Sequence, residues 1–187
     1  QFYSDLQAVC WKYIDNLSQG GINDNISLDA VTPSVVTDSQ QLYVAWIEDN
    51  KIRIKIFKNS SGWSFNDTAN DTNGQAGSIR FENDSDLFNP YLISLDDLDI
   101  TYLFWLEQNN NSISNLRYSF NLGGNWEVNK DLILNGNNAD SFDAIAANDF
   151  VYVAWNEINN TYQIRIKRIG FSNTTWLDAG GTLGIND

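Results

Sequence analysis

The chain has 187 residues, with 24 Asp and Glu against 11 Lys and Arg, no His and one Cys, so its formal net charge is −13. A surface this acidic repels phosphate backbones and anionic headgroups, which argues against nucleic acid and membrane-surface partners. Its 7 Trp, 8 Tyr and 10 Phe argue against disorder. No apolar run approaches the roughly 20 residues of a membrane helix, so membrane insertion is not expected. Histidine triads, Cys–His catalysis and typical zinc sites are excluded, and we expect no cofactor and no metal.

Residues 1–24 are interpreted as the end of a partial repeat unit. Trp11 is the first of four tryptophans, with Trp63, Trp126 and Trp176, whose successive members lie 50 to 63 residues apart. Cys10 beside it has no internal partner, so no internal disulfide forms. We expect a buried thiol there, with an intermolecular disulfide as the alternative.

Residues 25–75 are predicted to form a complete unit of four short strands. The first is 32–36, with Pro33 near its start, where a ladder donor is not needed. The second is 41–48, a nearly continuous apolar run that suits burial on both faces. The third, 51–58, alternates Ile with Lys and Arg, and we expect these cations to face solvent. The fourth begins at Trp63.

Residues 76–135 and 136–187 repeat this order, and the last segment includes a connector. Their expected strands are 89–93 and 100–107, then 142–146, 150–157 and 163–169, with short fourth strands at Trp126 and Trp176. The second strand of every unit carries the pattern Tyr, two residues, Trp, one residue, Glu. Its tryptophans are Trp46, Trp105 and Trp155, and its glutamates are Glu48, Glu107 and Glu157.

A period of 50 to 60 residues with four short strands is typical of β-propeller blades. No long segment shows helical periodicity, so we predict an all-β fold. It is a β-propeller with about three and a half four-stranded blades in this chain. The units form an open arc, or other chains or a missing portion complete it. All seven tryptophans are expected to pack between blades, with sugar stacking as the alternative.

The stretch 118–126 resembles the Asp-box of sialidase-type (BNR-repeat) β-propellers, Ser-x-Asp-x-Gly-x-x-Trp. Here the matching residues are Ser119, Asn121, Gly123 and Trp126, with Asn where Asp is usual. In that family the box is a hairpin turn at the rim of a blade. The turns before Trp63 and Trp176 are shortened or degraded versions. The resemblance implies a propeller, and it also suggests a glycoside hydrolase.

Glycosidase chemistry needs two placed carboxylates. A glutamate repeated in every unit is more typical of a structural role, so we expect hydrogen bonding between blades for Glu48, Glu107 and Glu157. No motif assigns catalytic roles to the arginines. We therefore predict no catalytic residues and leave the binding residues unassigned.

Nine Asn-x-Ser/Thr sequons exceed what composition predicts, and most fall in turns. We expect an N-glycosylated protein that is secreted or on the cell surface. The sequons begin at Asn16, Asn25, Asn59, Asn66, Asn70, Asn83, Asn110, Asn159 and Asn173.

The sequence favours a non-catalytic extracellular glycoprotein propeller for recognition, adhesion or extracellular assembly. One alternative is a portion of a sialidase-like glycoside hydrolase. Another is a structural subunit that assembles through open blade edges into an oligomer or filament. The expected partners are further copies of the chain or the remainder of a longer one, with carbohydrate as a candidate ligand.

Overall fold

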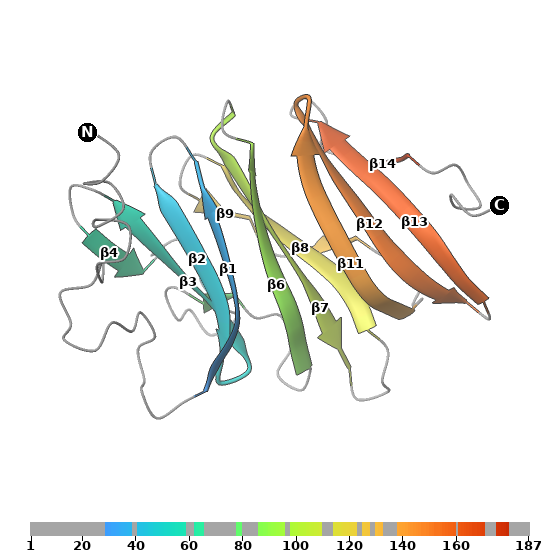
Figure 1. Cartoon of the computed structure of the whole chain (residues 1–187), viewed down its shortest axis with the longest axis horizontal. Helices are drawn as coiled ribbons and strands as arrows, with labels where there is room; N and C mark the ends of the chain where they lie inside the picture. Colours follow the sequence, from blue (N-terminus) through green and yellow to red (C-terminus); the bar gives the residue numbers. More distant parts are fainter. Residues whose placement is uncertain are drawn as a thin grey trace, which may run out of the picture.

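The computed structural model describes an all-β protein, as the sequence predicts. Its strands form three antiparallel sheets, and each sheet collects strands that are consecutive in the chain (Figure 1). The sheets lie side by side in chain order. The described residues are 29–38, 41–58, 62–65, 78–79, 86–95, 98–109, 114–122, 125–127, 130–132, 138–159, 161–170 and 175–179.

The first sheet has the strand order β1-β2-β3-β4, and β5 also pairs with β3. The short β5 lies in the segment 76–135 that the sequence assigned to the next unit, yet it belongs to this sheet. Its strands are β1 (Ala30–Thr37), β2 (Leu42–Glu48), β3 (Lys51–Lys58), β4 (Gly62–Phe65) and β5 (Ser78–Ile79).

The second sheet has the order β10-β8-β7-β6, with β9 also paired to β8. Two short strands, β9 and β10, therefore both pair with the third strand of this sheet, as β4 and β5 both pair with β3 in the first sheet. Its strands are β6 (Asp86–Leu95), β7 (Ile100–Gln108), β8 (Ser114–Leu122), β9 (Asn125–Trp126) and β10 (Lys130–Asp131).

The third sheet has the order β11-β12-β13-β14. Its three long strands have 10 residues each, and its fourth has two. Its strands are β11 (Asn138–Ala147), β12 (Phe150–Asn159), β13 (Thr161–Gly170) and β14 (Leu177–Asp178).

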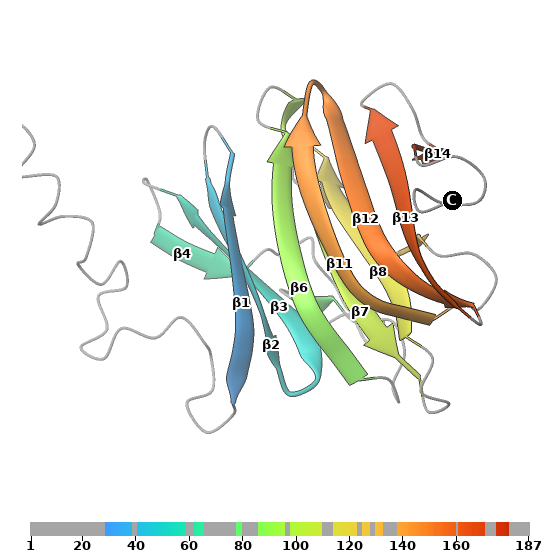
Figure 2. The same ribbon diagram turned by 45° about the vertical axis from the view of Figure 1, so that its right-hand side comes forward.

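The sheets pack against each other through two hydrophobic clusters. One joins the first sheet to the second, through residues such as Ile54 and Leu103. The other joins the second sheet to the third, through residues such as Phe104 and Val153. The first strands β1, β6 and β11 lie toward the viewer in Figure 2, and β6 contacts both of the others. The arrangement is a series of sheets in which each one covers a face of the next.

The burial of the second strands follows this order. Every residue of β7 from Ile100 to Glu107 is buried, because the middle sheet is covered on both faces. In β12 buried residues alternate with half-buried ones from Val151 to Ile158. The predicted burial on both faces is therefore confirmed for β2 and β7, and β12 is covered on one face.

A β-bulge interrupts the first strand of each sheet. The register shifts between Val31 and Ser34, between Phe88 and Tyr91, and between Ala139 and Phe142. Two residues at each shift oppose one residue of the next strand. The prolines of the first two sheets, Pro33 and Pro90, lie in these bulges.

The sequence placed Pro33 near the start of strand 32–36, and the expected strand 89–93 did the same for Pro90; both placements were wrong. The strands begin at Ala30 and Asp86. A bulge leaves a residue outside the ladder, so a proline without an N–H is tolerated there. The residues just before them, Thr32 and Asn89, have φ of 50° and 51°.

Two-residue turns close two of the hairpins. Asp49 and Asn50 join β2 to β3, and Asn148 and Asp149 join β11 to β12. All four have φ between 50° and 63°. Type I′ turns require positive φ at both central residues, which Asn and Asp tolerate best after glycine. These dipeptides therefore fix the register of the strands that follow.

Candidate functional site

The most distinctive side-chain arrangement is a trio of Trp, Glu and Arg that occurs in every sheet. The Trp and Glu are two residues apart on the second strand, so they point to the same face. The Arg lies on the third strand directly opposite the Trp, as the pairs Trp46↔Arg53, Trp105↔Arg117 and Trp155↔Arg165 show. Strand register alone thus brings the three groups together.

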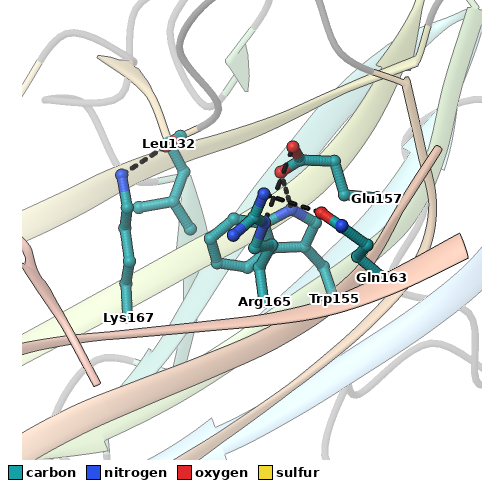
Figure 3. Close-up of polar contacts among 6 residues, drawn as sticks. All are labelled: Leu132, Trp155, Glu157, Gln163, Arg165 and Lys167. Atoms are coloured by element: carbon teal, nitrogen blue, oxygen red, sulfur yellow. Dashed lines mark hydrogen bonds and ion pairs between the residues drawn. The ribbon is translucent and has the colours of Figure 1, made fainter. Parts of the chain in front are cut away.

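In the third sheet the trio is drawn in Figure 3. The indole Nε1 of Trp155 donates to Oε2 of Glu157 at 3.2 Å, and Nε of Arg165 lies 3.7 Å from Oε1 of the same carboxylate. Arg165 also donates from Nη2 to Oε1 of Gln163 at 2.7 Å. Beside the trio, Nζ of Lys167 donates to the backbone oxygen of Leu132 in the second sheet, at 3.4 Å. The trio therefore lies at the junction between sheets.

In the second sheet the same contacts are more deeply buried. Nε1 of Trp105 donates to Oε2 of Glu107 at 3.4 Å, and Nε of Arg117 lies 3.4 Å from that oxygen. The side chain of Arg117 is 7% exposed and that of Glu107 is 2% exposed. This ion pair is held in a nearly dry environment.

In the first sheet Trp46 donates to Oε2 of Glu48 at 3.0 Å. Both residues are buried, and so is Arg53 opposite the tryptophan. Trp105 and Trp155 belong to the two junction clusters, and Trp46 belongs to neither. In the second and third sheets the face that carries the Trp–Glu pair therefore packs against the preceding sheet. In the first sheet this face points away from the second sheet.

The prediction that the third-strand cations face solvent is wrong for Arg53, which is 8% exposed. The alternating cations share a face with the Trp–Glu pair, and that face is covered. The buried carboxylate of Glu48 lies on the same face as this guanidinium. The alternating sequence pattern alone does not distinguish this covered face from a solvated one.

The tryptophans near the outer edges also lie at sheet junctions. Trp126 packs against the cluster between the first and second sheets. Trp176 packs against the cluster between the second and third, where its ring centroid lies 5.4 to 6.2 Å from those of Tyr102, Phe104 and Tyr118. Trp63 lies in β4 opposite Phe57. The side chain of Trp63 and all of Trp11 lie outside the described residues.

The box-like segment differs from a simple turn. Ser119 and Asn121 belong to β8 and are buried, because they pair with Leu103 and Thr101 of β7. The Ser119 hydroxyl donates to the backbone oxygen of Glu127. Leu122 pairs with Asn125, so the connection consists of residues 123–124, which include Gly123 and are not described. The serine ties the end of the hairpin back to its own strand.

Three tyrosines on the faces that meet the following sheet have raised pKa values. Burial raises the pKa of Tyr102 to about 12, and the neighbouring Tyr118 adds to the shift. Burial also raises the pKa of Tyr118. For Tyr43 burial is the largest cause, and the charges of Asp38 and Asp99 raise its pKa further. These hydroxyls stay protonated in the folded protein.

A shallow cleft of about 250 Å³ lies between the ends of the second and third sheets. Ser94, Leu95 and Leu98 form its side on the second sheet, and Asn148 and Asp149 line it from the third. One carboxylate beside hydroxyl and amide groups could hold a small polar ligand. The repeat pattern gave no sign of this cleft, because it is formed between two units.

Among the predicted glycosylation sites, Asn159 ends β12, where it pairs with Thr161 of its own sequon. The other eight sequon asparagines and Cys10 lie outside the described residues. Within the described ranges, no three His, Cys, Asp or Glu side chains gather as candidate metal ligands. No helix in this part of the chain has the length and apolar character needed to cross a bilayer.

No protein-family model matches the chain, and neither does any curated protein. The structure itself defines the class: an all-β protein of consecutive antiparallel sheets, each of which carries a Trp–Glu–Arg arrangement.

Proposed function

We propose that the chain is part of a non-catalytic, extracellular β-propeller glycoprotein that serves recognition, adhesion or extracellular assembly. The observation that carries this proposal is the repeated use of Glu48, Glu107 and Glu157. Each carboxylate accepts a hydrogen bond from an indole of its own strand. These repeated acids are engaged by side chains of their own sheets rather than across a junction between blades, which supports a structural role for them.

The propeller architecture is supported by the order of the sheets. Blades of a propeller follow one another in the chain, with the first strand of each nearest the centre. Here β6 contacts both β1 and β11 (Figure 2), and each sheet meets the next through opposite faces. About three and a half blades in this chain agree with the spacing of its tryptophans. The sheets remain an open arc, or further copies of the chain or the remainder of a longer one complete the ring.

Recognition or adhesion requires a surface away from the sheet junctions. The cleft lined by Ser94, Asn148 and Asp149 is the candidate, because it lies at the strand ends rather than within a junction. Its hydroxyl, amide and carboxylate groups suit a hydroxyl-rich ligand such as a carbohydrate. The nine sequons support an extracellular setting.

The test uses protein secreted from a host that N-glycosylates. We expect binding to one or more members of a glycan panel, no turnover of a fluorogenic sialoside, and a mass that falls on enzymatic removal of N-glycans. Asp149→Asn should weaken glycan binding, and Asp86→Asn, an exposed aspartate outside the cleft lining, is its control. Turnover that is lost on Asp149→Asn would instead establish a sialidase-like hydrolase and overturn the proposal.

A further inference from the structure

The third sheet has a face that no described sheet covers. Residues of β12 with even numbers point to this face, because Val151, Val153 and Trp155 point into the cluster shared with the second sheet. Cross-strand pairing adds Ile145 of β11 and Ile166 of β13 to the same side. We call it the outer face. It consists of Asp143, Ile145, Phe150, Tyr152, Ala154, Asn156, Ile158, Tyr162, Ile164, Ile166, Arg168 and Leu177.

The equivalent faces of the other sheets are buried. The tyrosine of the repeated pattern is 2% exposed at Tyr43 and 4% exposed at Tyr102, and both lie in junction clusters. Tyr152, at the same place in the third sheet, is half-buried. On the outer face Ile145 is 62% exposed and Tyr162 is 64% exposed. The outer face therefore has the composition of a sheet junction without the second sheet.

The opposite end of the series determines which surface can cover the outer face. A head-to-tail arrangement would place the Trp–Glu face of another copy's first sheet there. In this chain Trp46 is 3% exposed and Glu48 is 1% exposed, so the centre of that face is covered, and Val35 is exposed on its β1 side. The outer face exposes the larger apolar set, Ile145, Tyr162 and Leu177, so its best match among these surfaces is a second outer face.

We propose that two copies of this chain associate through their outer faces, in a two-fold symmetric pairing of third sheets. Closed two-fold dimers are the commonest homo-oligomers, and their interfaces are self-complementary. This inference applies to the open-arc form of the proposed propeller, because a blade that completed the ring would cover the outer face. It is independent of the glycan-binding function, because it uses a surface away from the cleft.

Charge placement supports the two-fold arrangement. Asp143 lies on β11, opposite Ala154, and Arg168 lies on β13, opposite Tyr152, so opposite charges flank β12 on the outer face. A two-fold axis along β12 places β11 of one copy over β13 of the other. Asp143 of each copy then approaches Arg168 of the other copy, which gives two equivalent ion pairs.

The area of the outer face indicates how tightly the two copies should bind each other. Three strands of 10 residues cover about 500 Å² per copy, at roughly 3.3 Å per residue and about 4.8 Å between strands. Two copies would bury about 1,000 Å², the low end for a specific interface. The pairing should therefore be reversible, with a dissociation constant on the order of micromolar.

The experiment is light scattering and sedimentation over a range of protein concentrations around that value. We expect a monomer–dimer equilibrium that reaches twice the 21.2 kDa of the polypeptide. Ile145→Lys should weaken dimerisation at least tenfold. Val35→Lys is the matched control, because Val35 is a β-branched residue of another first strand with the same 62% exposure. It should leave the dimer intact.

A charge exchange tests the symmetry. Asp143→Arg and Arg168→Asp should each weaken the dimer, and the double variant should recover most of the loss. Circular dichroism establishes that each variant keeps its sheets. A monomer at every concentration would overturn the proposal, and so would an open-ended series of larger oligomers, which a head-to-tail contact produces.

Discussion

The ion pair between Glu107 and Arg117 provides a direct measure of how dry the junction between sheets is. We expect Glu107→Gln, which keeps the size of the side chain and removes its charge, to destabilise the protein substantially. Glu107 is 2% exposed and Arg117 is 7% exposed, with 3.4 Å between Oε2 and Nε. The substitution leaves a buried guanidinium with less compensation, which typically costs about 3 to 5 kcal/mol. That is a large part of a typical total stability of about 5 to 15 kcal/mol.

Glu157→Gln in the third sheet is the matched comparison. Its Arg165 side chain is 23% exposed, and the atoms of the pair are 3.7 Å apart. Water therefore screens this pair more, and we expect a loss of about 1 to 2 kcal/mol. The assay is urea unfolding followed by tryptophan fluorescence, with the transition midpoint converted to free energy at constant slope.

Replacing both members of the buried pair completes the test. Glu107→Gln combined with Arg117→Met removes both charges, so it should recover a good part of the loss from Glu107→Gln alone. If Glu107→Gln costs less than about 1 kcal/mol, or costs no more than Glu157→Gln, the junction is not dry and the reasoning fails.

Three further predictions concern other parts of the fold. Trp176→Ala removes the ring that contacts Tyr118 and should cost about 2 to 4 kcal/mol in thermal or urea unfolding. The control is Thr175→Ser at the exposed neighbouring position, which keeps the Asn173 sequon and should change stability by less than about 0.5 kcal/mol. Thr32→Asn gives the first bulge the residue type that Asn89 provides in the second. It should stabilise the folded protein by about 0.5 to 1 kcal/mol, because a β-branched residue is strained at a φ of 50°. An unfolding midpoint that does not rise would count against this strain. The pKa of Tyr102 is raised from 10.0 to about 12 in the folded protein, so this tyrosine loses its hydroxyl proton at lower pH in the unfolded chain than in the folded one. Its contribution to the free energy of unfolding is therefore fully present below pH 10 and is lost as the pH rises toward 12. Tyrosinate absorbance should then rise together with the loss of sheet signal in circular dichroism, and ionisation of all tyrosines well before unfolding would contradict it.

The sequence predicts the strands well because their signals are local. The apolar runs at 41–48 and 100–107 and the alternation at 51–58 are visible residue by residue, and the repeated Trp and Glu reveal the unit. The consecutive order of the three sheets follows from the repeat. These features require no knowledge of what lies next to a strand.

What the sequence missed depends on neighbours in space. Arg53 has the same alternating context as a solvated cation, and only the covered face makes it buried. Arg117 belongs to a trio that is formed by strand register, which no spacing between its members reveals. Ser119 and Asn121 have the chemistry of turn residues, yet pairing with β7 draws them into a strand. The cleft beside Asp149 and the exposed face around Ile145 depend on where whole sheets begin and end.

The unequal faces of each sheet give the molecule a direction. The tryptophan of the second strand faces the preceding sheet in the second and third sheets, and the tyrosine of that strand faces the following sheet in the first and second. The units are not equivalent at every position: Phe104 lies in the middle sheet where the outer sheets have Ala45 and Ala154. Exchanging the second and third units would therefore leave a hole at one junction and a collision at the next. Units are therefore interchangeable only where the side chains that meet at their junctions match in volume.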